Sequence, residues 1–309
     1  MILTVTLNAA MDKTYFVPQL RFSEVNRVAK TIRTAGGKGL NVARTAGLLG
    51  APVITTGVLG GHTGRAIEEL LLEEGISFDF MWAPIESRTC INIIGSKGAS
   101  TELLEQGDPI GEEDVNRLLA HYRQALGAVD VVTLSGSVLK DMPSDIYGQL
   151  VSIAREQGKL VILDTNGTYL KKGIEAGPTI VKPNRDEIEY LMGVEDATQD
   201  ELIEYCNSWM EKGVKHVVVS LGAEGAIILN EDGAWHAQPP KLETINTVGS
   251  GDSMVGALAV GLQKLLNSEN LIREAVAVSA ANTLTESPGR FYAGDLEKIR
   301  RNTIVTRIR

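Results

Sequence analysis

The stretch TVGSGDSMVGALAVG, residues 247–261, places two glycines, a serine and an aspartate directly before a nearly all-apolar run. From Asp252 onward almost no polar face remains, which predicts a helix that is buried on all sides. The first turn of such a helix carries unpaired N–H groups and the positive end of the helix dipole. Gly249 and Gly251 let a ligand approach this backbone closely. The stretch therefore indicates an anion-binding pocket at the start of a buried helix.

Asp252 lies within reach of any anion that binds at this helix start. The arrangement suits phosphoryl transfer, in which amides hold the developing charge and a carboxylate accepts the proton of the attacking hydroxyl. An acidic residue that merely complements the helix dipole is an equally good interpretation of Asp252 alone. The paired glycines favour the functional one. With an ordinary pKa of ~3.9, Asp252 would be a weak base, and much of its effect would come from positioning.

The rest of the chain alternates short β-rich runs with helical patterns. Near-continuous Val/Ile/Leu strands are typical of a parallel sheet that helices cover on both faces, which predicts a doubly wound α/β fold. Such sheets bind ligands at the carboxyl ends of their strands. The expected strands are 52–60, 129–137, 159–167, 179–184 and 216–222, and the expected helices include 63–75, 143–158 and 201–213.

Two segments, 13–35 and 87–107, depart from this alternation, because they have the pattern of strands and turns without a helix between them. They are either hairpins at a sheet edge or a small β lid over the site, and the pattern alone leaves both open. We expect a single α/β domain over residues 1–309 with these two segments as inserts.

The chain has 309 residues, 43% of them hydrophobic, and a formal net charge of −9. This acidic balance argues against nucleic acid or an anionic membrane as a partner, whereas a few local cations can still hold a small anionic substrate. The N-terminal run MILTVTLNAA lacks the basic region of a signal peptide, and no apolar run approaches the ~18–20 residues that span a bilayer. Cys90 and Cys206 are expected to be reduced core thiols. These features together predict a cytoplasmic protein.

A second glycine-rich stretch, TAGGKGLNVARTAGLLG, occupies residues 34–50. In it, Lys38 could meet a phosphate and Asn41 could hydrogen-bond sugar hydroxyls. Val42 stands where a dinucleotide-binding fingerprint requires its third glycine, which disfavours an oxidoreductase. On this motif alone, tight helix–sheet packing is the favoured explanation of the glycines, which are Gly36, Gly37 and Gly39.

Two shorter motifs follow strands. In KPNRDE, residues 182–187, Asn184 and Glu187 share a helical face and could orient waters around Mg²⁺, or they could simply form a capping box. In SLGAEGA, residues 220–226, the backbone of a strand-to-strand turn could lie along a nucleotide, although a plain β-turn also explains it.

Three charged residues have two interpretations each. Asp12 follows the first strand and could hold two sugar hydroxyls, or it could form a turn. Arg27 and Arg88 could clamp a phosphate with bidentate hydrogen bonds, or they could be solvated surface charges.

Taken together and in this order, these motifs resemble the ribokinase-like (PfkB-type) carbohydrate kinase family. GGKGLNVAR and NTVGSGDSMVGALA are similar to its two signatures, and the resemblance covers almost the whole chain. TAGGKGLNVAR and TELLEQG are similar to the branch that phosphorylates hexose phosphates, which includes tagatose-6-phosphate kinase and 1-phosphofructokinase.

The resemblance implies an ATP- and Mg²⁺-dependent kinase that converts tagatose 6-phosphate or fructose 1-phosphate to a bisphosphate. Asp252 would be the base, and the anion hole would be the amides of Gly249, Ser250 and Gly251. The sugar phosphate would be held by Asp12, Gly37, Lys38, Asn41, Arg88 and Arg27. ATP would be bound by Lys182, Asn184, Ser220, Gly222, Gly225 and Asn282. Magnesium would be organised, through water, by Asn184 and Glu187. The two β segments would form a lid that joins two subunits as a homodimer.

Two alternatives remain on the same fold. One is a kinase of an unphosphorylated sugar or a nucleoside, against which the basic residues Arg27 and Arg88 argue. The other is a non-catalytic sensor of a sugar phosphate or nucleotide, which would have no need of Asp252 and its glycines.

Overall fold

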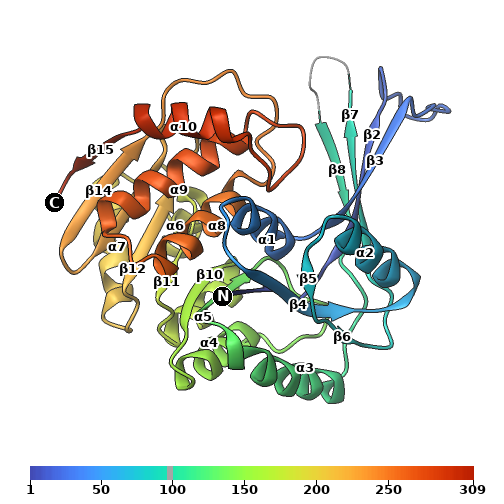
Figure 1. Ribbon diagram of the computed structural model, residues 1–309, viewed down its shortest axis with the longest axis horizontal. Coiled ribbons are helices and arrows are strands. Elements are labelled where there is room, and N and C mark those ends of the chain that lie inside the picture. Colours follow the sequence, from blue (N-terminus) through green and yellow to red (C-terminus); the bar gives the residue numbers. More distant parts are fainter. Residues whose placement is uncertain (96–99) are drawn as a thin grey trace.

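The computed structural model describes residues 1–95 and 100–309. Residues 96–99, which belong to the expected lid segment 87–107, lie outside this description. Strands and helices alternate along the chain (Figure 1), and the strands gather into a large sheet and a separate small one. The predicted α/β class with a small β-sheet built from two separated segments is therefore confirmed.

The large sheet has the strand order β15-β14-β13-β12-β11-β10-β9-β1-β4-β5, and β6 also pairs with β4. The neighbours from β12 to β5 are parallel, whereas β12, β13, β14 and β15 pair antiparallel. The strands are β1 (Ile2–Thr6), β4 (Val53–Leu59), β5 (Ser77–Phe78), β6 (Met81–Trp82), β9 (Val131–Ser135), β10 (Leu160–Asp164), β11 (Ile180–Val181), β12 (His216–Ser220), β13 (Ala226–Asn230), β14 (Gly233–Gln238) and β15 (Ile304–Arg307).

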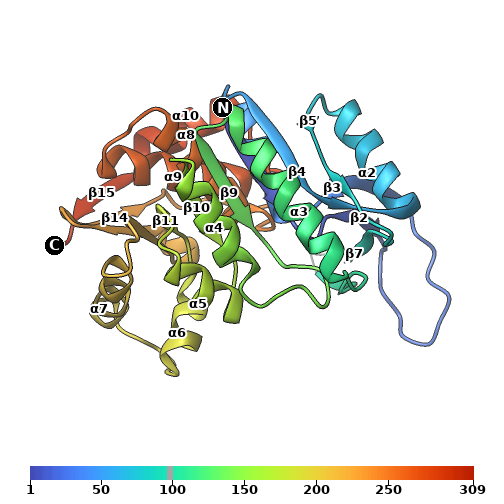
Figure 2. The same cartoon turned by 90° about the horizontal axis from the view of Figure 1, so that it is seen from below.

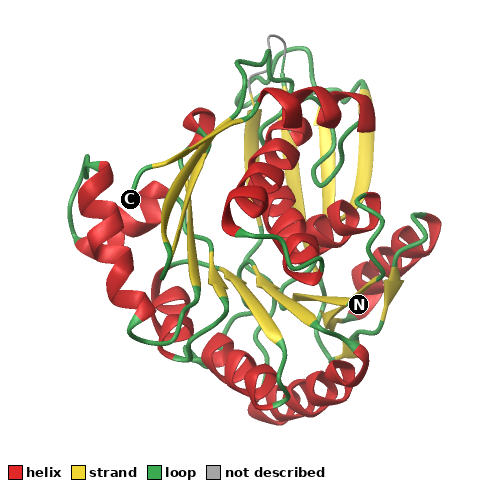
Figure 3. Cartoon of the chain, turned by 60° about the vertical axis from the view of Figure 1, so that its left-hand side comes forward, coloured by secondary structure: helices red, strands yellow, loops and turns green. Residues whose placement is uncertain are grey.

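Helices cover both faces of this sheet (Figure 3). One face packs against α3 (Glu112–Ala125), α4 (Ile146–Glu156), α5 (Gly167–Glu175), α6 (Arg185–Met192) and α7 (Gln199–Met210). The other face packs against α1 (Lys38–Leu48), α8 (Ser250–Gln263), α9 (Ser268–Asn282) and α10 (Ala293–Asn302). Successive strand residues alternate between the two cores, as Ile2 and Leu3 do in β1, which explains the continuous apolar runs.

The small sheet has the order β3-β2-β7-β8 and stands apart from the large one (Figure 1). Its strands are β2 (Ala10–Phe16), β3 (Lys30–Gly36), β7 (Arg88–Ile94) and β8 (Ser100–Leu104), and β2 pairs parallel with β7. The strands β2 and β3 extend beyond the expected segment 13–35, to Ala10 and Gly36. Ala10 and Met11 are buried at the base of the sheet, where Met11 packs near α2 (Gly61–Glu73). The loop between β2 and β3 projects from the molecule (Figure 2).

In the two described ranges, no helix combines the length and the apolar character that crossing a bilayer requires.

Candidate active site

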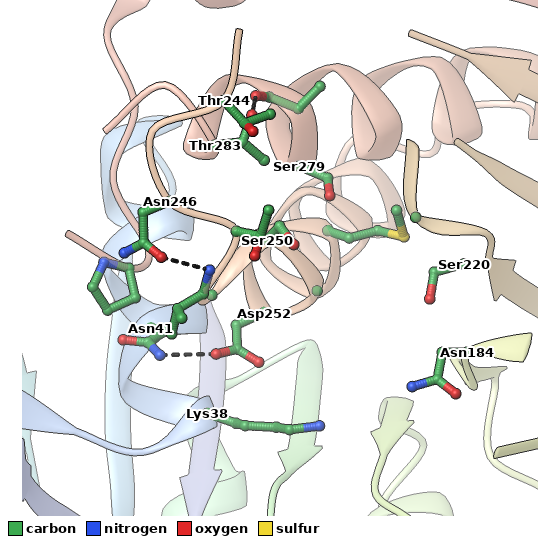
Figure 4. A pocket seen from close by; sticks show the side chains of 18 of the residues that line it. Lys38, Asn41, Asn184, Ser220, Thr244, Asn246, Ser250, Asp252, Ser279 and Thr283 are labelled. Carbon is green, nitrogen blue, oxygen red and sulfur yellow. Dashed lines mark hydrogen bonds between the residues drawn. The ribbon is translucent and has the colours of Figure 1, made fainter. Parts of the chain in front are cut away.

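A cleft of about 1270 Å³ lies between the small sheet and the carboxyl ends of the large-sheet strands. The small sheet lines one part of the cleft. The starts of α1 and α8 lie side by side, and the loops after β11 and β12 lie across from them (Figure 4). Predicted site residues that line the cleft are Asp12, Gly37, Lys38, Asn41, Arg88, Lys182, Asn184, Glu187, Ser220, Gly222, Gly225, Gly249, Ser250, Gly251 and Asp252. The cleft thus brings together most of the residues singled out in the sequence.

Helix α8 begins at the cleft and then runs through the core. Gly249 precedes it with a φ of 79°, and a Cβ atom there would lie 2.5 Å from Cβ of Pro288. The position therefore requires glycine for both its backbone conformation and its neighbour. All residues from Asp252 to Leu262 are buried, as the apolar pattern predicted.

Asp252 is itself buried at the cleft floor, with 7% of the residue exposed. Asn41 Nδ2 donates a hydrogen bond of 2.8 Å to Asp252 Oδ2 (Figure 4). Burial raises the pKa of Asp252, and the nearby charge of Lys38 opposes that rise. The expectation of an ordinary pKa is therefore wrong, because the sequence does not reveal how completely α8 withdraws this carboxyl from water.

Two glycines at the start of α1 are explained by close packing. A Cβ on Gly37, whose φ is 121°, would lie 2.7 Å from Thr6 Cγ2, and one on Gly39 would lie 2.7 Å from the Val5 carbonyl oxygen. The packing interpretation is therefore confirmed. Lys38 and Asn41 still reach the cleft from this tightly seated helix, so packing and placement of polar groups occur together.

Asp164, which the motif analysis did not single out, lies between two of the predicted lysines. Lys182 Nζ lies 3.2 Å from its Oδ1 and Lys38 Nζ lies 3.4 Å from its Oδ2. Burial alone would raise the pKa of Asp164, but Lys182 and Lys38 together hold it below the ordinary value. In return, Asp164 raises the pKa of Lys38. Its one sequence signal was its place at the carboxyl end of the apolar run KLVILD.

Asn184 and Glu187 form the capping box that was the alternative interpretation. Asn184 Oδ1 accepts from the Glu187 N–H at 2.7 Å, and Glu187 Oε2 accepts from the Asn184 N–H at 3.0 Å. Both still line the cleft, and burial raises the pKa of Glu187. No group of three His, Cys or acidic side chains in residues 1–95 and 100–309 could hold a metal ion directly. The oxygens of Asn184 and Glu187 are a donor set that fits Mg²⁺, which keeps several of its waters, better than a metal ion that protein ligands surround directly.

The stretch 220–226 forms a turn between β12 and β13 at the edge of the cleft. A short 3₁₀ helix, η3 (Gly222–Glu224), precedes Gly225, whose φ is 90°. A Cβ on Gly225 would lie 2.0 Å from the Ala237 carbonyl oxygen. The expected strand-to-strand turn is therefore confirmed, and its residues line the cleft.

Asp12 and Arg88 lie on the cleft face of the small sheet. Burial raises the pKa of Asp12 to about 6, although Arg44 and Arg88 oppose that rise. Arg88 donates from Nε to the Asn8 carbonyl at 3.2 Å and from Nη1 to the Glu105 carbonyl at 2.9 Å. Arg88 therefore ties the base of the small sheet to the large one while it lines the cleft.

Arg27 and Asn282 lie outside the cleft lining that the described residues form. Arg27 is exposed in the loop between β2 and β3. Asn282 is buried, and its Nδ2 donates to the carbonyls of Ser287 and Arg290 at 3.3 and 2.9 Å. The NH₂ group of Asn282 therefore faces this loop, while its neighbours Ser279 and Thr283 line the cleft (Figure 4).

Comparisons with known proteins agree with this arrangement. The profile described as pfkB family carbohydrate kinase matches residues 3–291. Phosphofructokinase-2 from Escherichia coli, in a crystal structure with potassium, is 28% identical with a TM-score of 0.90, over 97% of this chain and 98% of that one. A possible 1-phosphofructokinase from Thermotoga maritima is 27% identical with a TM-score of 0.86, and all of both chains is covered. A putative phosphofructokinase from Staphylococcus aureus is 29% identical with a TM-score of 0.85, over 99% and 98%.

Proposed function

The chain belongs to the pfkB family of carbohydrate kinases, and from this premise we propose that it transfers the γ-phosphoryl group of ATP to a ketohexose phosphate. The products are the sugar bisphosphate and ADP. The proposed substrates are tagatose 6-phosphate and fructose 1-phosphate. The proposal rests on the position of Asp252. This carboxylate lies buried at the start of α8, faces the cleft and accepts a hydrogen bond from Asn41 of α1.

In the proposed reaction a primary hydroxyl of the sugar lies against Asp252, which accepts its proton as the oxygen attacks phosphorus. The raised pKa of Asp252 makes it a better proton acceptor than an ordinary aspartate. The amides of Gly249, Ser250 and Gly251 face the charge that develops on the transferred group. Lys182 lies close to Gly251: a Cβ atom added to Gly251 would be 3.7 Å from Lys182 Nζ.

The small sheet and α1 form the proposed sugar side of the cleft. Lys38 and Arg88 are the cations that would bind the phosphate already present on the substrate. Asp12 would accept hydrogen bonds from sugar hydroxyls in its ionised form. These charges support a phosphorylated sugar as the substrate.

The other side of the cleft would bind ATP. The turn from Ser220 to Gly225 would line the nucleotide, together with Ser279 on α9 and Thr283 directly after that helix. Asn184 and Glu187 would hold Mg²⁺ through water, and the bound ion would neutralise charge on the phosphates. The capping box supports this role, since it fixes one oxygen of Glu187 and leaves the other, Oε1, outside the box.

The lid is also the proposed contact between two subunits. Apolar side chains are exposed there, among them Leu103 on β8 and Phe22 in the loop between β2 and β3, at 54% and 87% exposure. Such residues favour association of two copies. Sedimentation equilibrium of the wild type and of Leu103→Asp tests this: a wild-type monomer would contradict the dimer.

The test of the reaction is ADP release from Mg-ATP with tagatose 6-phosphate, fructose 1-phosphate, fructose 6-phosphate or unphosphorylated fructose. Wild type and Asp252→Asn are compared side by side. Turnover of a phosphosugar that the variant loses would support the proposal and name the substrate. Two outcomes would contradict it: ADP release with unphosphorylated fructose but with none of the sugar phosphates, or no sugar-dependent ADP release with any of the four compounds.

A further inference from the structure

A chain of buried side chains leads from Asp252 into the protein. Asn41 Nδ2 donates to Asp252 at 2.8 Å, and Arg44 Nη1 donates to Asn41 Oδ1 at 2.9 Å. Asn41 and Arg44 lie three residues apart on α1 and therefore on one face of that helix. The two hydrogen bonds occupy both ends of the Asn41 amide.

These two partners allow the Asn41 amide only one orientation. A guanidinium only donates hydrogen bonds, whereas an ionised carboxylate only accepts them. If the amide turned over, its NH₂ group would face Arg44 and its oxygen would face Asp252. Both hydrogen bonds would then be replaced by repulsive contacts inside the protein, where unpaired polar groups are costly.

Arg44 is itself held firmly on its other side. Its Nε lies 2.5 Å from Glu74 Oε2, and its Nη2 donates to Glu74 Oε1 at 3.0 Å and to the Ala35 carbonyl. Arg290 Nη2 lies 3.1 Å from the same Oε2 of Glu74. Only 4% of the Arg44 side chain is exposed. A planar guanidinium with these partners is fixed in its direction toward Asn41.

We propose that Arg44 is a positioning residue for phosphoryl transfer, because it holds Asn41 in the orientation that donates to Asp252. This inference rests on the proposed role of Asp252 as the base. The competing explanation is an ion pair between Arg44 and Glu74 that only joins α1 to the end of α2. The two explanations differ in whether the effect of Arg44 on turnover passes through Asn41.

A double-mutant cycle separates them. Arg44→Met/Glu74→Gln removes both charges of the ion pair together and so leaves neither of these two residues as a buried charge without its partner. We expect kcat to fall about tenfold or more, while KM for Mg-ATP stays within about twofold. In an Asn41→Ala background the same pair of changes should lower kcat by less than about twofold, because the hydrogen bond from Asn41 to Asp252 is already missing. Arg44→Lys keeps a hydrogen-bond donor but loses the planar guanidinium. Its kcat should therefore lie between those of Arg44→Met/Glu74→Gln and the wild type.

Arg300 and Glu274 provide a matched control pair between α9 and α10. Arg300 Nε lies 2.6 Å from Glu274 Oε1, and Nη2 donates to Oε2 at 3.0 Å. Arg300→Met/Glu274→Gln removes a similar bidentate pair and should leave kcat unchanged. Equal losses of kcat with Asn41 present and absent would overturn the proposal in favour of the structural ion pair.

A second measurement does not depend on turnover. The side-chain amide protons of Asn41, assigned by their disappearance in Asn41→Ala, should exchange slowly with water in the wild type. In Arg44→Met/Glu74→Gln they should exchange about tenfold faster, and in the Arg300→Met/Glu274→Gln control they should not change. Unchanged exchange in the first variant would overturn the proposal. If exchange responds but the wild type phosphorylates no sugar, the proposed function fails while the role of Arg44 in orienting Asn41 stands.

Discussion

Lys182 and Asp164 face each other inside the protein, with Lys182 Nζ 3.2 Å from Asp164 Oδ1 and only 5% and 1% of the two side chains exposed. Lys38 Nζ lies 3.4 Å from the second carboxylate oxygen. One buried carboxylate therefore holds two ammonium groups beside the cleft, and this cluster of three groups by itself has a net positive charge. That surplus charge suits a site for phosphates.

Asp164→Asn should destabilise the fold, because it leaves both ammonium groups without a counter-ion. Removing one partner of a buried ion pair costs roughly 3–5 kcal/mol. Since Lys38 is partly exposed, we expect the lower end of this range in urea unfolding. Glu175→Gln, which breaks the exposed pair with Lys212, is the control and should cost less than about 1 kcal/mol. Equal stabilities of Asp164→Asn and the wild type would show that the pairing contributes nothing.

Asp252→Asn should keep the fold and lose turnover. General-base catalysis typically contributes about 10²–10⁴-fold, so we expect kcat to fall by that factor. KM for ATP should change little, since Asn41 can still donate to the amide oxygen. The melting temperature should not fall, because burial disfavours the ionised carboxylate that the variant removes. A variant with near-normal kcat would rule out Asp252 as the base.

Asp12 should make stability depend on pH in a defined window. Its pKa is raised from 3.8 to about 6 in the folded protein, so the folded state holds this proton more tightly than the unfolded chain. The stabilisation is complete below pH ~4 and is lost as pH rises to ~6. We therefore expect Asp12→Asn to gain free energy of unfolding relative to the wild type across this range, and to keep that gain above it. Urea titrations from pH 4.5 to 8 measure the difference, and a difference independent of pH would contradict the shifted pKa.

Arg88→Ala should weaken the binding of phosphosugar more than that of ATP. Hydrogen bonds to charged groups contribute about 1.5–3 kcal/mol, so KM for the sugar phosphate should rise about 10- to 100-fold. Arg33→Ala is the control, because Arg33 lies on the same small sheet but outside the cleft lining that the described residues form. An unmoved KM for sugar phosphate would place the phosphate clamp elsewhere.

The sequence predicted the features that depend on local pattern. Continuous apolar runs indicated a parallel sheet, because a strand covered on both faces needs apolar residues at every position. The run after Asp252 predicted the buried helix α8, since no polar face remained. The segments 13–35 and 87–107 stood out because neither carries a helical period. Each of these signals lies within one element.

Relations between distant residues could not be predicted in this way. Asp164 and Lys38 are 126 residues apart, and the pattern of β10 does not reveal which side chains face its end. No local pattern marks Arg44 on α1, and its partner Glu74 comes from the end of α2. Asn282 was expected at the adenine, and the pattern of α9 does not reveal that its NH₂ group donates to two carbonyls of the following loop. Burial and partner geometry arise only when the elements pack.

The pairing of β2 with β7 has a consequence for how the chain folds. These strands are parallel and lie far apart in the sequence, from Ala10 and from Arg88 onward. The β2–β3 hairpin leaves the ribosome long before its neighbour, and an isolated two-stranded hairpin is marginally stable at best. Contacts between such distant segments form late, because closing the intervening chain costs entropy. The small sheet can therefore be completed only after β4 and α2 have brought β7 to its place.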